Sequence, residues 1–397
     1  MKQLLLVTGL LLLFTAEILR VYYIMPFPGS QQSNTIDLAY WLHNNIYWVR
    51  ILGLLLIAYP VVQVFKQTGA WKKVLLVVVL ALYATVFYFF NYRFLADKMF
   101  YQPGTTAFAP AASNKVAADR LVIGVVADGV AKAYPIQLIG YHHQVRDTIG
   151  HLPVMVTYCT VCRTGRVFSP IVDGHPETFR LVGMDHFNAM FEDATTKSWW
   201  RQVSGEAIAG PLKGKKLTEI PSTQMTLAAW LQQYPGSLVF QPDTTFNKQY
   251  DHLALFDKGT IESGLEKREP AAWKMKSWVV GVEQGDQAKA YDWTDLTRKQ
   301  LIEDSLPGMP ILLTLDSDTA SFHVLKRSVN GTTLQFKKDN GVDSLTDVNT
   351  QSRWTTSGLS VGGPLKGTQL ERVQAYQEFW HSWRTFHPGT LQYRAAK

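Results

Sequence analysis

Cysteine is scarce in this sequence: the 397 residues contain only two, Cys159 and Cys162, separated by two positions. A site built from three or four thiolates is therefore excluded, and further metal ligands would have to come from other residue types. Three common catalytic motifs are also absent: a glycine-rich phosphate loop, a Gly-x-Ser-x-Gly nucleophile turn and a His-Glu-x-x-His helix. The sequence names no reaction, and whether the protein is an enzyme stays open.

The net charge of +7 is unevenly distributed along the chain. Residues 1–95 carry +5, in and beside long apolar runs, and the remaining residues carry only +2. Proteins that bind nucleic acid present a strongly basic surface. A nearly neutral soluble part therefore predicts that nucleic acid is not a partner.

Three apolar runs predict transmembrane helices, at about residues 4–25, 46–65 and 74–92. Each is close to the roughly 20 residues that cross a bilayer. The first run could instead be a cleaved signal peptide, but no clear small-x-small cleavage site follows it, so an uncleaved helix is favoured. The lipid bilayer is thus the first predicted partner.

Basic residues next to the runs predict the orientation of the chain. Lys66, Lys72 and Lys73 lie in the connection 66–73, whereas residues 26–45 contain no Lys or Arg. Because short cytoplasmic loops are enriched in Lys and Arg, the connection 66–73 is predicted to be cytoplasmic and residues 26–45 to lie outside. The sequence predicts a multi-pass protein of the cell inner (plasma) membrane with residues 96–397 extracytoplasmic.

Three charged residues fall within the apolar runs. Glu17 and Arg20 have the i, i+3 spacing of a helical pair, and their position favours a simple pair at the interface. Arg50 lies near the start of its run, where its side chain can extend to the membrane surface.

The soluble part has the pattern of an α+β fold that is mainly β. Residues 96–117 are rich in Ala, Pro, Gly and Ser, which predicts a linker. Short β-like runs separated by turns follow, among them Pro153–Tyr158 and a hairpin turn at Val172–Gly174. Residues 136–145 and 224–233 have the apolar spacing of helices.

An internal repeat organises this part. Gly124-Val125 with the later Ala-Lys-Ala-Tyr run recurs from Gly281, and Gly210-Pro211-Leu212-Lys213-Gly214 recurs from Gly363. The sequence therefore predicts a first repeat domain at 118–242, a connection at 243–275 and a second, degenerate repeat domain at 276–394. Motifs present in both copies are interpreted as scaffold.

The cysteine pair occurs in the first copy only. Cys159 aligns with Asp316 and Cys162 with Thr319, so the second copy lacks the pair. A strand leads into Cys159, and the Gly and β-branched residues after Cys162 predict a β-turn, not the helix N-terminus that activates thioredoxin-like cysteines. Three uses stay open: a small structural disulfide, a thiol redox pair, and a metal site.

A metal site would need helpers for the two thiolates, which favour soft or borderline ions such as copper or zinc. His142 and His143 precede the strand that carries Cys159, and Met190 follows the hairpin. His142 aligns with Lys299 in the second copy. The candidate ligand set is therefore Cys159, Cys162, His142, His143 and Met190.

Several separated blocks resemble DUF3179, a family of unknown function. The blocks are Tyr134-Pro135, His142, Asp147, Ile149-Gly150, Pro153, Val156 to Cys162, Met190, Ser198-x-Trp200 and Gly205 to Leu212. The resemblance covers about 118–394 and implies a site at the cysteines, but no reaction. The family motif usually reads Thr-Tyr-Cys-Pro-Leu-Cys-Gly-Thr, and this chain departs from it at Thr160, Val161 and Arg163. It also has His143 where the family tends to have an acidic residue.

The sequence thus predicts a membrane-anchored extracytoplasmic protein with a Cys-x-x-Cys site for copper or zinc binding or for thiol redox chemistry, acting on an unknown extracytoplasmic partner or substrate. The alternative is a non-catalytic scaffold that binds a partner or glycan, in which the cysteines form a structural disulfide. In that case exposed aromatic residues such as Trp199 would matter more than the thiols.

Overall fold

A computed structural model describes residues 1–339 and 343–394 of the chain. The chain divides into two compact units. The first contains Met1–Tyr101 and Gly174–Lys216, and the second contains Gln102–Asp173 and the described residues from Leu217 onward. Residues 174–216, which belong to the predicted first repeat domain, are therefore grouped with the N-terminal helices.

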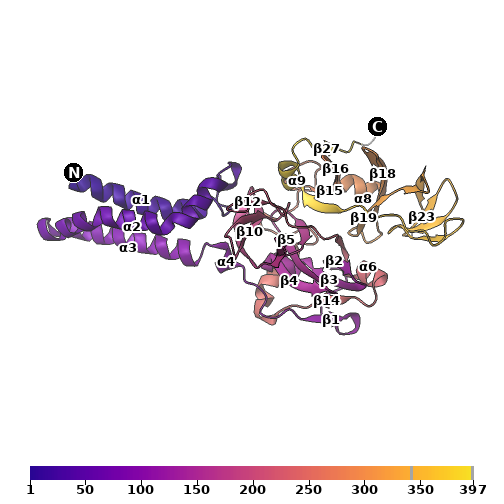
Figure 1. Ribbon diagram of the computed structural model, residues 1–397, viewed down its shortest axis with the longest axis horizontal. Helices are drawn as coiled ribbons and strands as arrows, with labels where there is room; N and C mark the ends of the chain where they lie inside the picture. Colours follow the sequence, from indigo (N-terminus) through magenta and orange to yellow (C-terminus); the bar gives the residue numbers. More distant parts are fainter. Residues whose placement is uncertain (340–342, 395–397) are drawn as a thin grey trace. The chain divides into compact units, whose positions relative to one another are not determined.

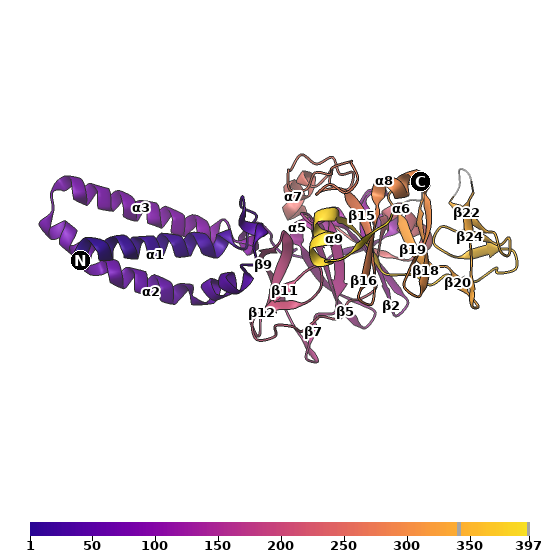
Figure 2. The same ribbon diagram turned by 90° about the horizontal axis from the view of Figure 1, so that it is seen from above.

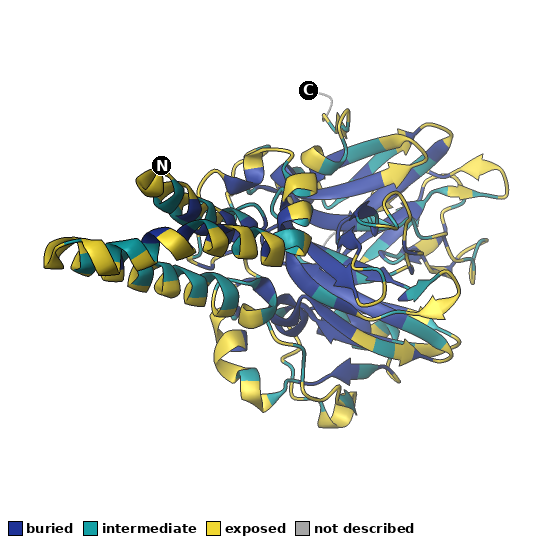
Figure 3. Cartoon of the chain, turned by 60° about the vertical axis from the view of Figure 1, so that its left-hand side comes forward, coloured by how far each residue is buried: buried dark blue, intermediate teal, exposed yellow. Residues whose placement is uncertain are grey.

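Three helices dominate the first unit and run side by side (Figures 1 and 2). They are α1 (Lys2–Tyr22), α2 (Ile36–Gln67) and α3 (Ala70–Tyr92), and all three are long and apolar enough to cross a membrane. Their outward surfaces are largely exposed, in contrast to the buried strands (Figure 3). Apolar side chains without protein neighbours are typical of helices that face lipid.

The second helix begins at Ile36, earlier than the predicted residue 46. The segment before residue 46 is too polar to be recognised by hydropathy, yet Ala39, Leu42 and Ile46 form a buried stripe at helical spacing. Glycine brings this helix close to α1, because a Cβ on Gly53 would lie 2.6 Å from Leu13 Cγ.

The predicted pairing of Glu17 with Arg20 is confirmed, but Glu17 has a closer partner that the sequence did not indicate. The Arg50 Nε and its terminal nitrogen donate to the two Glu17 carboxylate oxygens at 2.6 and 2.8 Å. Glu17 is fully buried and also accepts from Asn91 Nδ2 at 2.9 Å. Arg20 is farther from this carboxylate, at 4.0 Å. A carboxylate buried among apolar helices needs such a partner, and the nearer arginine provides it.

The first unit also contains a four-stranded sheet in the order β12-β11-β10-β9. Its strands are β9 (Phe179–Asp185), β10 (Asn188–Asp193), β11 (Trp199–Arg201) and β12 (Ala207–Ala209). The short elements α4 (Ala96–Met99) and β8 (His175–Pro176) belong to the same unit. Trp199 is fully buried, with its indole 5.1 Å from the Tyr40 ring, so it is not the exposed aromatic residue that the scaffold alternative requires.

The second unit contains the same order of elements twice. The first set is β2 (Leu121–Ala127), β3 (Val130–Pro135), α5 (Ile136–His142), β4 (Gln144–Ile149), β5 (Leu152–Cys159), β6 (Thr164–Phe168), β13 (Thr223–Thr226), α6 (Leu227–Gln233) and β14 (Leu238–Phe240). The second set is β15 (Trp278–Gln284), β16 (Gln287–Asp292), α8 (Trp293–Lys299), β17 (Leu301–Leu306), β18 (Met309–Leu315), β19 (Phe322–Lys326), β26 (Ala375–Phe379), α9 (Trp380–Phe386) and β27 (Leu391–Gln392).

These strands form sheets in the orders β1-β14-β3-β2-β13, β4-β5-β6, β26-β15-β16-β27 and β17-β18-β19. A further sheet, β22-β23-β24-β25, is formed by β22 (Phe336–Lys338), β23 (Ser344–Asp347), β24 (Arg353–Thr355) and β25 (Ser360–Gly362). The remaining short strands of this unit are β1 (Phe108–Pro110), β7 (Ile171–Val172), β20 (Ser328–Val329) and β21 (Thr332–Thr333). The architecture is α+β with many small sheets.

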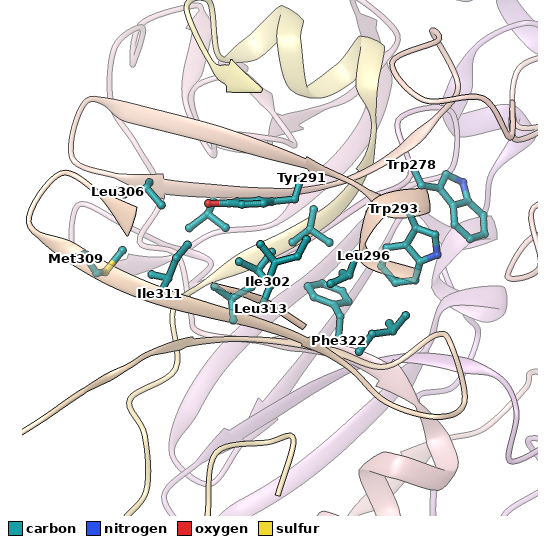
Figure 4. Packing of buried hydrophobic residues seen from close by; sticks show 14 of the residues in the cluster. Trp278, Tyr291, Trp293, Leu296, Ile302, Leu306, Met309, Ile311, Leu313 and Phe322 are labelled. Carbon is teal, nitrogen blue, oxygen red and sulfur yellow. The ribbon is translucent and has the colours of Figure 1, made fainter. Parts of the chain in front are cut away.

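Short-range contacts explain why the shared motifs are needed. Tyr134 donates to Asp147 at 2.6 Å, and Tyr291 donates to Asp304 at 2.8 Å, so each Ala-Lys-Ala-Tyr run ties its strand to the next sheet. A Cβ on Gly281 would lie 2.2 Å from the Trp383 ring, so only glycine leaves room for that indole. The core between β16 and β18 is closed by large apolar side chains around Tyr291 (Figure 4).

The predicted linker and connection are more ordered than the sequence indicated. In the 96–117 segment, β1 pairs with β14 in antiparallel register, Phe108 opposite Phe240. In the 243–275 segment, α7 (Asn247–His252) follows a short 3-10 helix at Thr244–Phe246. Tyr250 and Phe256 of this segment are buried, which explains why it is folded and not extended.

Candidate functional site

The two cysteines lie at the ends of a tight turn between β5 and β6. Cys159 is the last residue of β5 and lies opposite Thr164, the first residue of β6. Arg163 closes the turn by donating its backbone amide to Thr160 O at 3.2 Å. The prediction that the pair lies on a β-turn, not at a helix N-terminus, is confirmed.

Both cysteines are fully buried. The two sulfur atoms lie 3.8 Å apart, a near contact without a disulfide bond. Burial raises the pKa of the Cys162 thiol well above its usual value, and the neighbouring Cys159 adds to this effect. The thiol form is therefore strongly favoured when no other charge enters the site.

Lys276 and His381, from a distant part of the chain, cover the turn. Lys276 Nζ donates to Val161 O at 2.7 Å and lies 3.1 Å from His381 Nε2. Burial lowers the pKa of Lys276, although the two cysteines oppose this shift, and burial lowers the pKa of His381 to about 3. At neutral pH the imidazole is therefore uncharged.

A buried ion pair continues the site on the side of β6. Arg166 donates to Glu378 Oε1 at 2.6 Å, and Ser382 Oγ donates to Glu378 Oε2 at 3.0 Å. The Ser382 hydroxyl also hydrogen-bonds Cys162, which acts to lower the pKa of that thiol. The backbone joins the two regions as well, because Phe379 N donates to Cys162 O at 2.9 Å. The turn is thus held by charged and polar groups that leave it no exposed side.

Arg163 occupies the position where the family motif usually has glycine. Its φ is +54°, the left-handed conformation that glycine adopts without strain. The guanidinium is buried, with its carbon 3.8 Å from the centre of the Trp278 ring, and it donates to Gln377 Oε1 at 2.9 Å. These contacts stabilise a backbone conformation that is otherwise unfavourable for arginine.

The predicted histidines lie in the second unit, but each has a local partner. His142 is buried at the end of α5, with its Nε2 2.6 Å from the Tyr250 hydroxyl. His143 adopts φ +61°, and its Nδ1 lies 3.1 Å from Tyr141 O. Burial lowers the pKa of His143 to about 4, so this ring is neutral at physiological pH.

The remaining predicted ligand, Met190, belongs to the first unit. It is fully buried on β10, opposite Gly183 of β9 and Arg201 of β11. Across residues 1–339 and 343–394, no group of three or more His, Cys, Asp or Glu side chains is arranged to hold a metal ion. The structure therefore brings together Cys159 and Cys162, and it does not gather the histidines with them into a larger ligand group.

Sequence reasoning missed Lys276 and His381. Both residues share one feature with the cysteines: each occurs in only one of the two aligned halves, since Lys276 aligns with Asp119 and His381 with Ala228. Searching the second half for residues that the first half lacks would have found them. Neither residue lies near the cysteines in sequence, so no local motif points to the contact.

Comparison with known proteins gives a family and no activity. The model of the family described as "Protein of unknown function (DUF3179)" matches residues 103–390, which is more than half of the chain. No curated protein and no solved structure matches. The chain belongs to the DUF3179 family.

Proposed function

We propose that this protein is anchored in a membrane and holds a copper(I) ion between the thiolates of Cys159 and Cys162. The observation that carries the proposal is a pair of fully buried sulfur atoms, 3.8 Å apart, on a turn whose Val161 O accepts from the half-buried Lys276 Nζ. Thiolates select soft ions, and copper(I) accepts two sulfur ligands. A small opening of the sulfur pair would admit the ion.

Charge favours copper(I) over zinc. Two thiolates and a monovalent ion carry a net charge of −1, which the single charge of Lys276 offsets. Two thiolates and a divalent ion are already neutral, so the ammonium would leave an uncompensated charge in a buried place. Zinc also requires about four ligands in tetrahedral geometry. The described residues offer no third or fourth His, Cys, Asp or Glu at the pair.

A thiol redox pair is the second candidate, and the near contact of the sulfur atoms supports it. In that reaction the two thiols lose two electrons and two protons as the S–S bond forms, and a partner disulfide is reduced to two thiols. Burial counts against this candidate, because both sulfur atoms are inaccessible to a partner disulfide. The scaffold alternative relied on exposed aromatic residues such as Trp199, but Trp199 is buried and cannot contact a partner or glycan.

We also infer that residues 118–242 and 276–394 arose by tandem duplication, and that the second copy has no cysteine site. Equivalent contacts support this inference. Trp200 Nε1 donates to Asp193 at 2.8 Å, and Trp354 Nε1 donates to Asp347 at 2.9 Å. The residue that aligns with Cys159 is Asp316, which lies opposite Ser321 as Cys159 lies opposite Thr164.

The orientation of the chain is part of the proposal. Lys66, Lys72 and Lys73 flank the connection between α2 and α3, which supports a cytoplasmic location for that connection. The soluble part then lies outside the inner membrane, where disulfides form and where copper(I) must be shielded from oxidation. A fully buried pair provides that shielding.

The test uses the full-length protein, purified in detergent without chelators. Copper and zinc are quantified and free thiols are counted after unfolding, for the wild-type chain, for C159S/C162S, and for M190L and H142Q as controls for the wider ligand set. Near-stoichiometric copper that is lost only in C159S/C162S supports the proposal. A disulfide without metal supports the redox candidate, and two free thiols that take up no copper overturn the proposal.

A further inference from the structure

The second unit contains a large cavity that borders the cysteine turn but does not include the cysteines. Its volume is about 940 Å³. Both halves of the duplicated region and the segment that joins them contribute to its wall. Six of the residues that line it are Leu121, Arg163, Asp257, Arg268, Trp278 and Trp293.

Trp278 is the centre of this wall. The residue is 6% exposed, and two guanidinium carbons lie near the centre of its ring, that of Arg163 at 3.8 Å and that of Arg268 at 4.2 Å. A Cβ on Gly259 would lie 2.5 Å from Trp278 Cζ2, so the glycine leaves room for this arrangement. The stacked cations and the indole form a preorganised surface.

Three buried polar atoms of the cavity wall have no hydrogen-bond partner within the part of the chain that the structure describes. They are the donors Trp278 Nε1 and Arg268 Nε and the acceptor Asp257 Oδ1. An unpartnered polar atom in a buried place is costly, and such atoms are rare in folded proteins. All three atoms belong to residues that line one cavity, and a molecule bound there would supply the missing partners.

Other charged side chains of the wall already have polar partners. Lys258 lies 3.8 Å from Asp119, and Arg298 donates to Asp295 at 2.6 Å. Asp318 accepts from Thr226 Oγ1 at 2.8 Å.

Arg163 donates to neutral oxygens only, those of Phe256, Asp257 and Gln377. Among the described residues, Arg268 has no carboxylate within ion-pairing distance. Asp257 is the acidic group that acts on Arg163, and Asp292 acts on Arg268. The Asp257 Oδ2 already accepts from Leu121 N at 3.1 Å. Within the described residues, neither arginine therefore has a direct carboxylate partner, and each can receive an anionic group.

We propose that this cavity binds a small molecule that carries one carboxylate or phosphate group together with a hydroxyl or amino group. The anionic group accepts from Trp278 Nε1 and Arg268, and the hydroxyl or amino group donates to Asp257 Oδ1. A guanidinium recognises a carboxylate or phosphate through a planar set of donors. The inference goes beyond the copper proposal and does not depend on it, because none of the three atoms belongs to the cysteine pair.

The test measures binding to the full-length protein in detergent by isothermal titration calorimetry. The probes are glycolate, which combines a carboxylate with a hydroxyl, and glycerol phosphate, which combines a phosphate with hydroxyls, with sodium chloride at equal ionic strength as the blank. Saturable binding of one probe identifies the anionic group. Weakening by about tenfold or more is expected in R268Q, because a charged hydrogen bond is lost, and a similar loss is expected in W278F, which keeps the ring but lacks the indole N–H.

R298Q is the matched control, since Arg298 borders the same cavity but is already paired with Asp295. C159S/C162S should bind as the wild-type chain does, which separates this inference from the copper site. The inference is overturned if neither probe binds saturably. It is also overturned if R298Q weakens binding as much as R268Q, because the effect would then be general electrostatics. A folded W278F variant with unchanged affinity would exclude the indole as a donor and contradict the assignment.

Discussion

The buried carboxylate of Glu17 gives a prediction that can be worked out from the contacts. Replacing one partner of a buried ion pair typically costs 3–5 kcal/mol, because the other charge is left uncompensated. In R50Q, Glu17 keeps Asn91 as a donor and has Arg20 at 4.0 Å, so we expect a loss of about 3 kcal/mol. In E17Q, two arginines share Asn91 Oδ1 without a carboxylate, so we expect a loss of about 5 kcal/mol.

The assay is unfolding by SDS in mixed micelles, followed by helical circular dichroism, with a double-mutant cycle. The E17Q/R50Q double variant should lose less than the sum of the single losses, by roughly 2 kcal/mol, because the two residues interact directly. K72Q, an exposed charge on α3, is the control and should change the unfolding free energy by less than about 0.5 kcal/mol. The reasoning is refuted if R50Q lowers the free energy of unfolding as much as E17Q does. It is also refuted if the losses of the two single variants add up to the loss of the double variant.

Three further predictions concern the second unit. G281A should destabilise the fold by about 3 kcal/mol in chemical unfolding, because its new methyl group would meet an indole at 2.2 Å, whereas G236A, with open space at the Cβ, should cost less than about 0.5 kcal/mol. K276M should weaken copper(I) affinity by roughly tenfold to a hundredfold in a competition assay and leave both thiols titratable. The control K274M should keep the wild-type affinity. Equal copper(I) affinities of K276M and the wild-type chain would show that the charge of Lys276 does not stabilise the bound ion. Burial alone would raise the pKa of Asp347, but hydrogen bonds from an indole and from backbone amides lower it. The stability that this carboxylate contributes is therefore present above the unfolded pKa of about 3.9. It is lost as the pH falls through the folded pKa. D347N should therefore flatten the acid limb of the stability curve, and an unchanged acid limb would contradict this.

The sequence predicted features that depend on neighbouring residues. The three long apolar helices follow from continuous apolar runs, and the turn at Cys159 follows from a strand that meets Gly and β-branched residues. The start of α2 was missed because hydropathy does not detect a helix segment whose buried stripe, such as Ala39 and Leu42, is flanked by polar residues.

The coverage of the cysteine turn could not be predicted in this way. Lys276 and His381 reach Val161 from more than a hundred residues away in the chain, and a single sequence contains no record of such contacts. For the same reason the sequence offered His142 as a metal ligand, although its ring nitrogen already has the Tyr250 hydroxyl as a partner. A single sequence does not distinguish a buried histidine that hydrogen-bonds another side chain from a histidine that binds a metal.

The most direct test of the copper proposal is X-ray absorption at the copper edge, on full-length protein loaded with copper(I) in detergent. The account predicts two sulfur neighbours from Cys159 and Cys162, no histidine nitrogen, and loss of the bound copper in C159S/C162S. A nitrogen neighbour, a third or fourth ligand, or copper retained in the double variant would contradict it.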